Sequence, residues 1–126
     1  MQRRGDGRRS RGRWGEALAA AWLRLKGYRI EARNWRCSLG EIDIVARDRR
    51  TLVFVEVKAR SGTSVGPPEE AVDARKQRRL VQLAQAYLAK HAAQTACRFD
   101  VIAISGRLPA PRIRHLRDAF RADGLT

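Results

Sequence analysis

Cysteine is scarce in this sequence: there are two among 126 residues, and they do not form a Cys-x-x-Cys pair. Cys37 and Cys97 stand far apart, and only His91 and His115 could join them as ligands of a soft metal. A zinc site would need these four scattered residues to converge in the fold. We therefore expect ordinary thiols and no zinc site.

Long apolar segments are also missing. No stretch approaches the roughly 20 uninterrupted apolar residues of a membrane-spanning helix. The N-terminal residues lack the apolar segment of a secretory signal and, although rich in arginine, show no amphipathic helix of a transit peptide. These absences predict a cytoplasmic protein with no membrane partner.

Acidic residues are few: 13 Asp and Glu oppose 27 Lys and Arg, which gives a formal net charge of +14. Such a balance favours a polyanionic partner, with nucleic acid first and an acidic membrane surface second. Arginine carries most of the positive charge, and its planar guanidinium matches phosphate better than an ammonium does. The composition therefore indicates nucleic acid, although a merely soluble basic protein would share this charge.

Several functional signatures are absent: a Gly-rich phosphate loop, a Ser-His-Asp set, an internal repeat and a heptad array. The length fits one domain. Residues 1–13 hold six arginines against Asp6 alone, with no apolar residue after Met1. Such a segment cannot bury surface, so a mobile basic arm is expected at 1–13, followed by a domain at 14–120 and a tail at 121–126.

The apolar spacing predicts the elements of that domain. A helix should begin at Trp14 and stop at Gly27. Alternation predicts a strand at about 28–33, a turn at 34–39 and two strands at about 40–46 and 52–58. Asp73 can cap a helix over 74–90, and strands follow at 98–105 and 112–116, the second a short edge strand. The order α-β-β-β-α-β-β indicates an α/β fold with a central sheet flanked by helices, in which strand 52–58, apolar on both faces, is central.

Charged side chains interrupt the two most strand-like segments. Alternation places Glu41 and Asp43 on one face of the first strand, and Glu56 and Lys58 on one face of the second. A hairpin loop of two or four residues pairs positions whose numbers sum to 99, which sets Asp43 opposite Glu56 and Glu41 opposite Lys58. A three-residue loop without a bulge would instead put Asp43 and Glu56 on opposite faces.

Two carboxylates opposed on a half-buried sheet repel each other unless a cation or a proton intervenes. Asp43 and Glu56 could together hold Mg²⁺ or Mn²⁺, which leave positions open for a substrate phosphate. Lys58 could orient or deprotonate the attacking water, or stabilise charge on the phosphate. A structural alternative is a Glu41–Lys58 ion pair across the hairpin, which would leave Asp43 opposite Glu56 without a partner.

These positions belong to a wider set of motifs between about Trp14 and Phe120. They are Gly15-Glu16-x-x-Ala19, Gly27-Tyr28, Asn34, Gly40-Glu41-Ile42-Asp43, Val53-Phe54-Val55-Glu56-Val57-Lys58-x-Arg60, Lys76 and Arg98-Phe99-Asp100-Val101. In this set the sequence resembles the PD-(D/E)XK nuclease superfamily and, more narrowly, the YraN family of uncharacterised proteins. That family is similar in fold to archaeal Holliday-junction resolvases.

The resemblance implies a restriction-endonuclease-like mixed sheet and a metal-dependent endonuclease, with branched DNA as a candidate substrate. It implies Asp43 and Glu56 as metal ligands, Lys58 as the catalytic lysine and Glu16 as the first-helix acid that completes the site. Ile42 stands where the superfamily often has proline. Since resolvases act as dimers, the resemblance alone implies a homodimer. With Glu41, these residues form the candidate catalytic set.

A second class of function is a non-catalytic nucleic-acid-binding module on the same scaffold, and a third is a ribosome-associated or membrane-surface basic protein. For either nucleic-acid function, the expected phosphate contacts come from the arm, the strand end and the helix start. They are Arg8, Arg9, Arg11, Arg13, Arg60, Arg75, Lys76, Gln77, Arg78 and Arg79. No base-stacking aromatic cluster is evident to separate DNA from RNA, and the preference for DNA comes from the resemblance.

Overall fold

The computed structural model describes residues 3–59, 73–91, 94–106 and 110–121, with side chains described from Trp14 onward. Its elements are α1 (Arg3–Leu25), β1 (Arg29–Cys37), β2 (Gly40–Asp48), β3 (Thr51–Ala59), α2 (Ala74–Lys90), β4 (Cys97–Ser105) and β5 (Arg112–Phe120). These strands form a sheet in the order β1-β2-β3-β4-β5, where β3 and β4 run parallel and the other neighbours antiparallel. The predicted α/β class and element order are confirmed, and the strand order is consistent with a restriction-endonuclease-like sheet.

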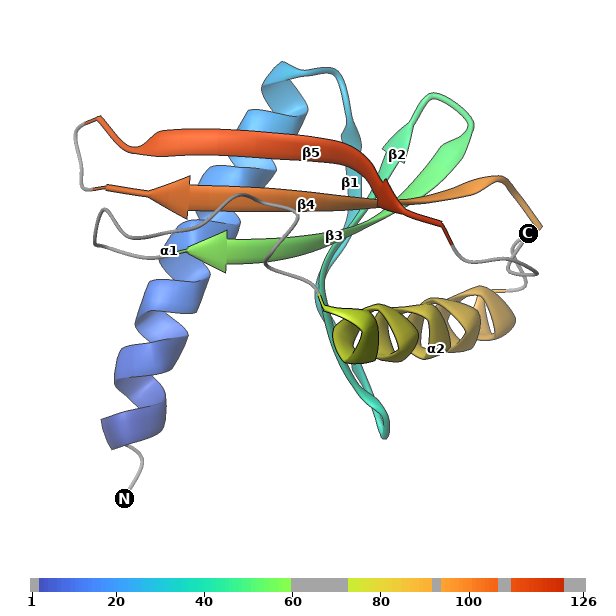
Figure 1. Ribbon diagram of the computed structural model, residues 1–126, viewed down its shortest axis with the longest axis horizontal. Helices are drawn as coiled ribbons and strands as arrows, with labels where there is room; N and C mark the ends of the chain where they lie inside the picture. Colours follow the sequence, from blue (N-terminus) through green and yellow to red (C-terminus); the bar gives the residue numbers. More distant parts are fainter. Residues whose placement is uncertain (1–2, 60–72, 92–93, 107–109, 122–126) are drawn as a thin grey trace.

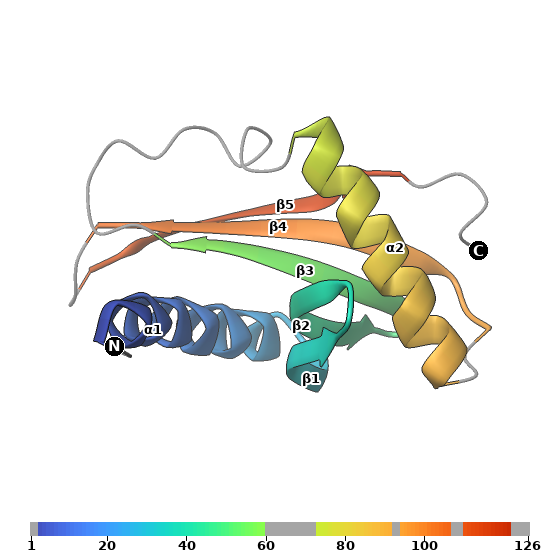
Figure 2. The same ribbon diagram turned by 90° about the horizontal axis from the view of Figure 1, so that it is seen from below.

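The sheet separates the two helices. Figure 1 shows α1 passing behind the strands, and in Figure 2 α1 lies below β3 and β4 while the N-terminal end of α2 lies above them. Alternate residues of β3 serve the two layers: Val53 and Val55 pack in the α1 layer, and Leu52 and Phe54 pack in the α2 layer. Strand β3 is the third of five strands in the sheet order, which confirms the prediction that it is central.

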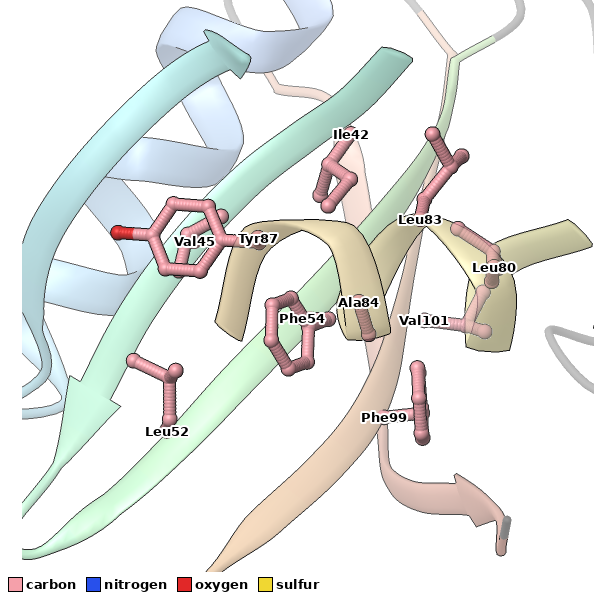
Figure 3. Close-up of a cluster of buried hydrophobic side chains, with 10 residues drawn as sticks. All are labelled: Ile42, Val45, Leu52, Phe54, Leu80, Leu83, Ala84, Tyr87, Phe99 and Val101. Carbon is pink, nitrogen blue, oxygen red and sulfur yellow. The ribbon is translucent and has the colours of Figure 1, made fainter. Parts of the chain in front are cut away.

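Helix α2 forms as the sequence predicts. Asp73 caps it, because its Oδ1 accepts a hydrogen bond from the backbone N–H of Lys76 at 2.9 Å. The buried stripe covers the sheet, as Figure 3 shows, with Tyr87 edge-on to Phe54 at 5.8 Å between ring centroids. The buried helix residues are Leu80, Leu83, Ala84 and Tyr87.

Helix α1 packs closely on the opposite face. A Cβ atom on Gly15 would lie 2.5 Å from the Cβ of Ala59, so glycine is required where the helix crosses the end of β3. The helix ends where predicted: Gly27 has φ +93°, and Tyr28 N–H donates back to the Leu23 carbonyl at 2.9 Å. Neither described helix is long and apolar enough to cross a bilayer.

The predicted start of α1 is wrong. The helix begins at Arg3 instead of Trp14, so residues 3–13, which we expected in a mobile arm, belong to the helix. Arginine is a good helix former, and a helix nucleated by packing from Trp14 onward can propagate through it. The expected boundary at 13/14 is therefore not a boundary of secondary structure.

Two strands are also longer than predicted. Strand β1 continues to Cys37 because Asn34, which we expected in a turn, stays in the strand with φ +54°, a left-handed conformation that asparagine tolerates. Strand β5 continues to Phe120, whose ring stacks on Phe99 at 4.6 Å between centroids. Aromatic packing thus extends β5 beyond the short edge strand that we expected at 112–116.

Candidate active site

The two central carboxylates lie where β2 and β3 begin to part. The β2–β3 register has Ile44 opposite Val55 and Asp48 opposite Thr51, which confirms the predicted pairing of positions that sum to 99. The described pairs stop at Ile44–Val55, one position before Asp43 and Glu56. There the Asp43 side chain replaces the backbone ladder, since its Oδ2 accepts the Val57 N–H at 2.8 Å.

Asp43 and Glu56 are half-buried and strongly affect each other. Burial, together with the nearby Glu56 charge, raises the pKa of Asp43 to about 8, and the hydrogen bond from the Val57 N–H opposes this rise only in part. Burial also raises the pKa of Glu56, against the lowering effects of Lys76, Lys58 and a hydrogen bond with the Asp43 side chain. Two charged carboxylates this close would repel each other, and a shared proton or a cation would relieve that repulsion.

Glu16 approaches this pair from α1. It is only 8% exposed, and its Oε1 atom has no hydrogen-bond partner among the described residues. Burial raises the pKa of Glu16, while a hydrogen bond with Asn34 lowers it. Its charge also raises the pKa of both Asp43 and Glu56, so the three acids share one electrostatic site. Glu16 directly follows Gly15, where α1 comes close to Ala59 of β3.

Glu41 takes a different position from the one predicted. The β2–β3 pairs end before it, so the predicted opposition to Lys58 is not formed; instead Glu41 lies opposite Arg36 of β1, 3.6 Å from its Nε atom. The reason is the divergence of β2 from β3. Glu41 still raises the pKa of Asp43 and Glu16, so it borders the site.

Two lysines bring positive charge to the acids. Lys58, half-buried near the end of β3, lowers the pKa of Glu56, as predicted from its place two residues further along the same strand face. Lys76, in the first turn of α2, lowers it more strongly. The first turn of α2 holds no acid, so its positive dipole adds to the lysine charge. An anion such as phosphate would be attracted to this end of the site.

A metal fits these residues only in part. Among the residues that the structure describes, no three Asp, Glu, His or Cys side chains are arranged as a ready ligand cage. Of the predicted ligands, the carboxylates of Asp43 and Glu56 form one interacting pair, and Glu16 contributes one oxygen, Oε1, that has no hydrogen-bond partner among the described residues. Mg²⁺ commonly binds through one or two carboxylates and keeps several waters, and this arrangement suits that mode.

The predicted phosphate contacts divide into two groups. Those on α2 are described, and Arg75, Lys76, Arg78 and Arg79 are exposed while Gln77 is half-buried. Arg79 also lies near the β1–β2 turn, because a Cβ on Gly40 would be 3.6 Å from its Nε. Arg60 and the side chains of Arg8, Arg9, Arg11 and Arg13 lie outside the described residues.

A second polar cluster lies around Asp100 of β4. Asp100 is 1% exposed and is the centre of a hydrogen-bond network. Its carboxylate accepts bonds from Arg98 at 2.9 and 3.1 Å, from the Asp118 N–H at 3.0 Å and from Tyr28 at 3.3 Å, and contacts His115 Nε2 at 2.8 Å. Burial alone would raise the pKa of Asp100, but these bonds lower it to about 2.

Comparison with known proteins identifies relatives of this chain. The family described as "Uncharacterised protein family UPF0102" matches residues 15–104. A "UPF0102 protein" of Syntrophotalea carbinolica is 50% identical over 118 residues, covering 93% of this chain and 96% of that protein. One of Anaeromyxobacter dehalogenans is 48% identical over 121 residues, covering 95% and 90%.

Among solved structures, "The structure of Pyrococcus Furiosus SfsA in complex with Ca2+" matches with a TM-score of 0.39 and 17% identity. That match covers 86% of this chain and 63% of the SfsA chain, so this chain spans less than two thirds of SfsA. The family match, in contrast, covers most of the chain at about half identity. The chain belongs to the UPF0102 family, which confirms the YraN part of the resemblance.

Proposed function

We propose that this protein is a metal-dependent endonuclease that hydrolyses phosphodiester bonds in nucleic acid. The observation that carries the proposal is the Asp43–Glu56 pair, which holds two acids side by side at a raised pKa beside Lys58 and the orphan oxygen of Glu16. Strongly perturbed acids next to specific charges are typical of functional sites. The resemblance to the PD-(D/E)XK superfamily points to the same reaction.

Each residue has a role in this proposal. Asp43 and Glu56 would hold Mg²⁺ or Mn²⁺, with Glu16 and Glu41 adding negative charge around it. The metal would stabilise charge on the phosphoryl oxygens and acidify a bound water. Lys58 would orient the attacking water or stabilise the charge that develops on the phosphate. Lys76, whose charge acts on Glu56 from the start of α2, would draw the phosphate toward the acids.

The substrate we propose is DNA in preference to RNA, with branched DNA as the first candidate, by resemblance to the archaeal Holliday-junction resolvases. The exposed cations of α2, Arg75, Lys76, Arg78 and Arg79, suit backbone phosphates. Action as a homodimer in the cytoplasm belongs to the same proposal and rests on the resemblance and the sequence.

Cleavage of a substrate panel tests the proposal. Purified protein is incubated with labelled linear duplex, single-stranded and four-way-junction DNA and with structured RNA, in Mg²⁺, Mn²⁺ or chelator. Metal-dependent cutting is expected, and D43N and K58M should each slow it by at least about 100-fold. D118N makes the same chemical change at an exposed β5 residue whose side chain contacts Arg121, and it should cut within about twofold of wild type.

Binding measured in Ca²⁺ or chelator separates the two classes of function. An endonuclease should keep substrate affinity in D43N while losing cleavage. Binding by every variant with no cleavage in any metal would overturn the proposal and support a non-catalytic binding module. Such a module should bind as well or better without the Asp43 charge, because one repulsive group is removed.

A further inference from the structure

A separate pocket opens on the α1 face of the sheet. It has a volume of about 640 Å³, within the range of small-molecule sites. The end of α1, the β2–β3 turn and β5 form its walls, and the wall residues include the aromatic rings Trp22, Tyr28 and His115. None of the wall residues belongs to the candidate active site. The pocket lies at the C-terminal end of α1 and the turn end of the β2–β3 hairpin, whereas Glu16 lies earlier on α1 and Asp43 and Glu56 lie where β2 and β3 part. The pocket is therefore distinct from the candidate active site.

The inner wall is rigid because the Asp100 network fixes it. Trp22 Nε1–H can only donate, and it bonds His115 Nδ1 at 3.3 Å, so this nitrogen accepts and Nε2–H donates to Asp100. Tyr28 bonds both Asp100 and Arg98. Each ring of the wall is thus held by a buried partner, and the wall can receive a ligand with little loss of side-chain entropy.

The rim of the pocket is cationic. Lys26, Arg49 and Arg117 line it against a single acid, Asp48. The negative charge of Asp48 is already balanced, since its Oδ2 accepts hydrogen bonds from Arg98 and Arg117, both at 3.0 Å. Arg49 makes no ion pair in the described part of the chain, and the Arg117 side chain is 62% exposed. Two or three positive charges are therefore available to an anion.

Rings and cations together select a class of ligand. Lys26 Nζ already lies 4.5 Å from the centre of the Trp22 ring, so charge and aromatic surface adjoin. A simple anion would contact the cations and would not use the aromatic surface beside them. Aromatic and guanidinium planes stack nucleobases, and lysine and arginine bind phosphate. We propose that this pocket binds one nucleotide, through its base and its phosphate, either free or as part of a single strand.

Titration with thymidine 5′-monophosphate and with an eight-residue oligothymidylate tests this inference. The local readout is the indole N–H signal of Trp22 in a ¹H–¹⁵N spectrum, assigned by its loss in W22F. Both ligands should shift this signal, and the K26Q/R49Q double variant should weaken binding at least about tenfold. Thymidine or inorganic phosphate alone should bind at least about tenfold more weakly than the nucleotide.

A matched double variant provides the control. R24Q/R50Q removes the same two charges from exposed neighbours in the same helix end and the same turn, outside the pocket lining. It should change affinity by less than about twofold. Oligothymidylate binding much tighter than the mononucleotide would indicate a strand, and equal affinities a free nucleotide; either supports the proposal.

Three results would overturn the inference. Equal losses of ligand affinity in K26Q/R49Q and R24Q/R50Q would show that overall positive charge, and not this pocket, binds the ligand. Inorganic phosphate binding as tightly as the nucleotide would leave an anion site without base recognition. A Trp22 signal unmoved by about 1 mM of either ligand, in a protein whose other signals show it folded, would leave no site at all. None of these outcomes depends on whether the Asp43 site cleaves nucleic acid.

Discussion

Asp43 on β2 and Asp100 on β4 are aspartates of one sheet in opposite surroundings. Asp100 is bonded by Arg98, Tyr28 and a backbone N–H and contacts His115, and its pKa falls to about 2. Asp43 receives one backbone N–H and faces other acids, and its pKa rises to about 8. A fully bonded buried charge is part of the architecture, whereas an under-bonded one marks a place where the protein maintains strain for another purpose.

The largest effect should come from breaking the bonded member of this pair. D100A removes the acceptor from Arg98, Tyr28 and the Asp118 N–H and leaves the Arg98 charge under-compensated in a largely buried place. We expect a loss of about 3–5 kcal/mol in the free energy of unfolding, measured by urea denaturation. D118N, which removes the exposed Arg121 ion pair and keeps a side chain that tolerates the φ of +54° at this position, should lose less than about 1 kcal/mol. Similar losses in both variants would contradict the central role of Asp100.

The next effect tests how α1 delivers Glu16 to the under-bonded site. G15A adds a Cβ at 2.5 Å from that of Ala59 and should push the helix away from β3. We expect about 1–3 kcal/mol of lost stability, together with slower cleavage in the assay of the proposed endonuclease activity. A59G in the same chain removes the opposing carbon and should restore part of both. A G15A loss that A59G does not reduce would show that the contact is not the cause.

Removing the Asp43 charge should have the opposite sign to D100A. The folded pKa of about 8 lies above the ordinary value of 3.8, so the folded state keeps a proton that the unfolded chain releases. Stability should therefore fall as pH rises from about 4 to about 8. D43N keeps an acceptor for the Val57 N–H, and at pH 8 it should be more stable than wild type by about 1–2 kcal/mol.

The Asp100 contribution should depend on pH in the other direction. Its folded pKa of about 2 lies below 3.8, so this contribution is complete above about pH 4 and is lost as pH falls toward 2. Urea denaturation of wild type, D43N and D100A at several pH values measures both trends. If the free energy of unfolding of D43N changed with pH between 5 and 8 as steeply as that of wild type, the raised pKa of Asp43 would be contradicted.

Divalent metal should relieve the strain at Asp43 and leave Asp100 unaffected. At about five times its dissociation constant, Mg²⁺ or Mn²⁺ should stabilise the wild type by about 1 kcal/mol, seen as a rise in Tm. D43N should lose most of this rise, and D118N should keep it. A rise of equal size in D43N would place metal binding elsewhere in the chain.

The smallest effect is expected at the edge of the site. Arg36 and Glu41 are 3.6 Å apart, and the Arg36 side chain is 67% exposed. R36Q should therefore cost less than about 0.5 kcal/mol of stability by urea denaturation. A loss as large as that of G15A would show that Arg36 supports the acids as well as the surface.

The Asp43–Glu56 site could be predicted because its geometry is local. Both residues lie in one hairpin, and strand alternation with a short loop fixes which side chains meet. The predicted Glu41–Lys58 opposition failed for a reason that alternation cannot express, since β2 pairs with β3 only from Ile44 onward and Glu41 precedes that part of the strand. The approach of Glu16 from α1 to this pair was implied only by the resemblance to the PD-(D/E)XK superfamily.

The Asp100 network could not be predicted in this way because its members are distant in sequence. Tyr28 precedes β1 and His115 lies on β5, and only the fully assembled sheet brings their side chains to Asp100. The extension of β1 through Asn34 was missed for a related reason. Asparagine is typical of turns, and the paired strand overrode that tendency.

The parallel pairing of β3 with β4 has a consequence for how the chain folds. The other strand pairs join neighbours in sequence, whereas Leu52 pairs with Cys97 and the segment between them must close as a loop. That closure carries the largest entropic cost in the sheet, so we expect it to limit the folding rate. During synthesis, Glu16, Asp43, Glu56 and Lys58 all emerge before β4. The acids therefore reach their final separation from water only after β4 has paired with β3.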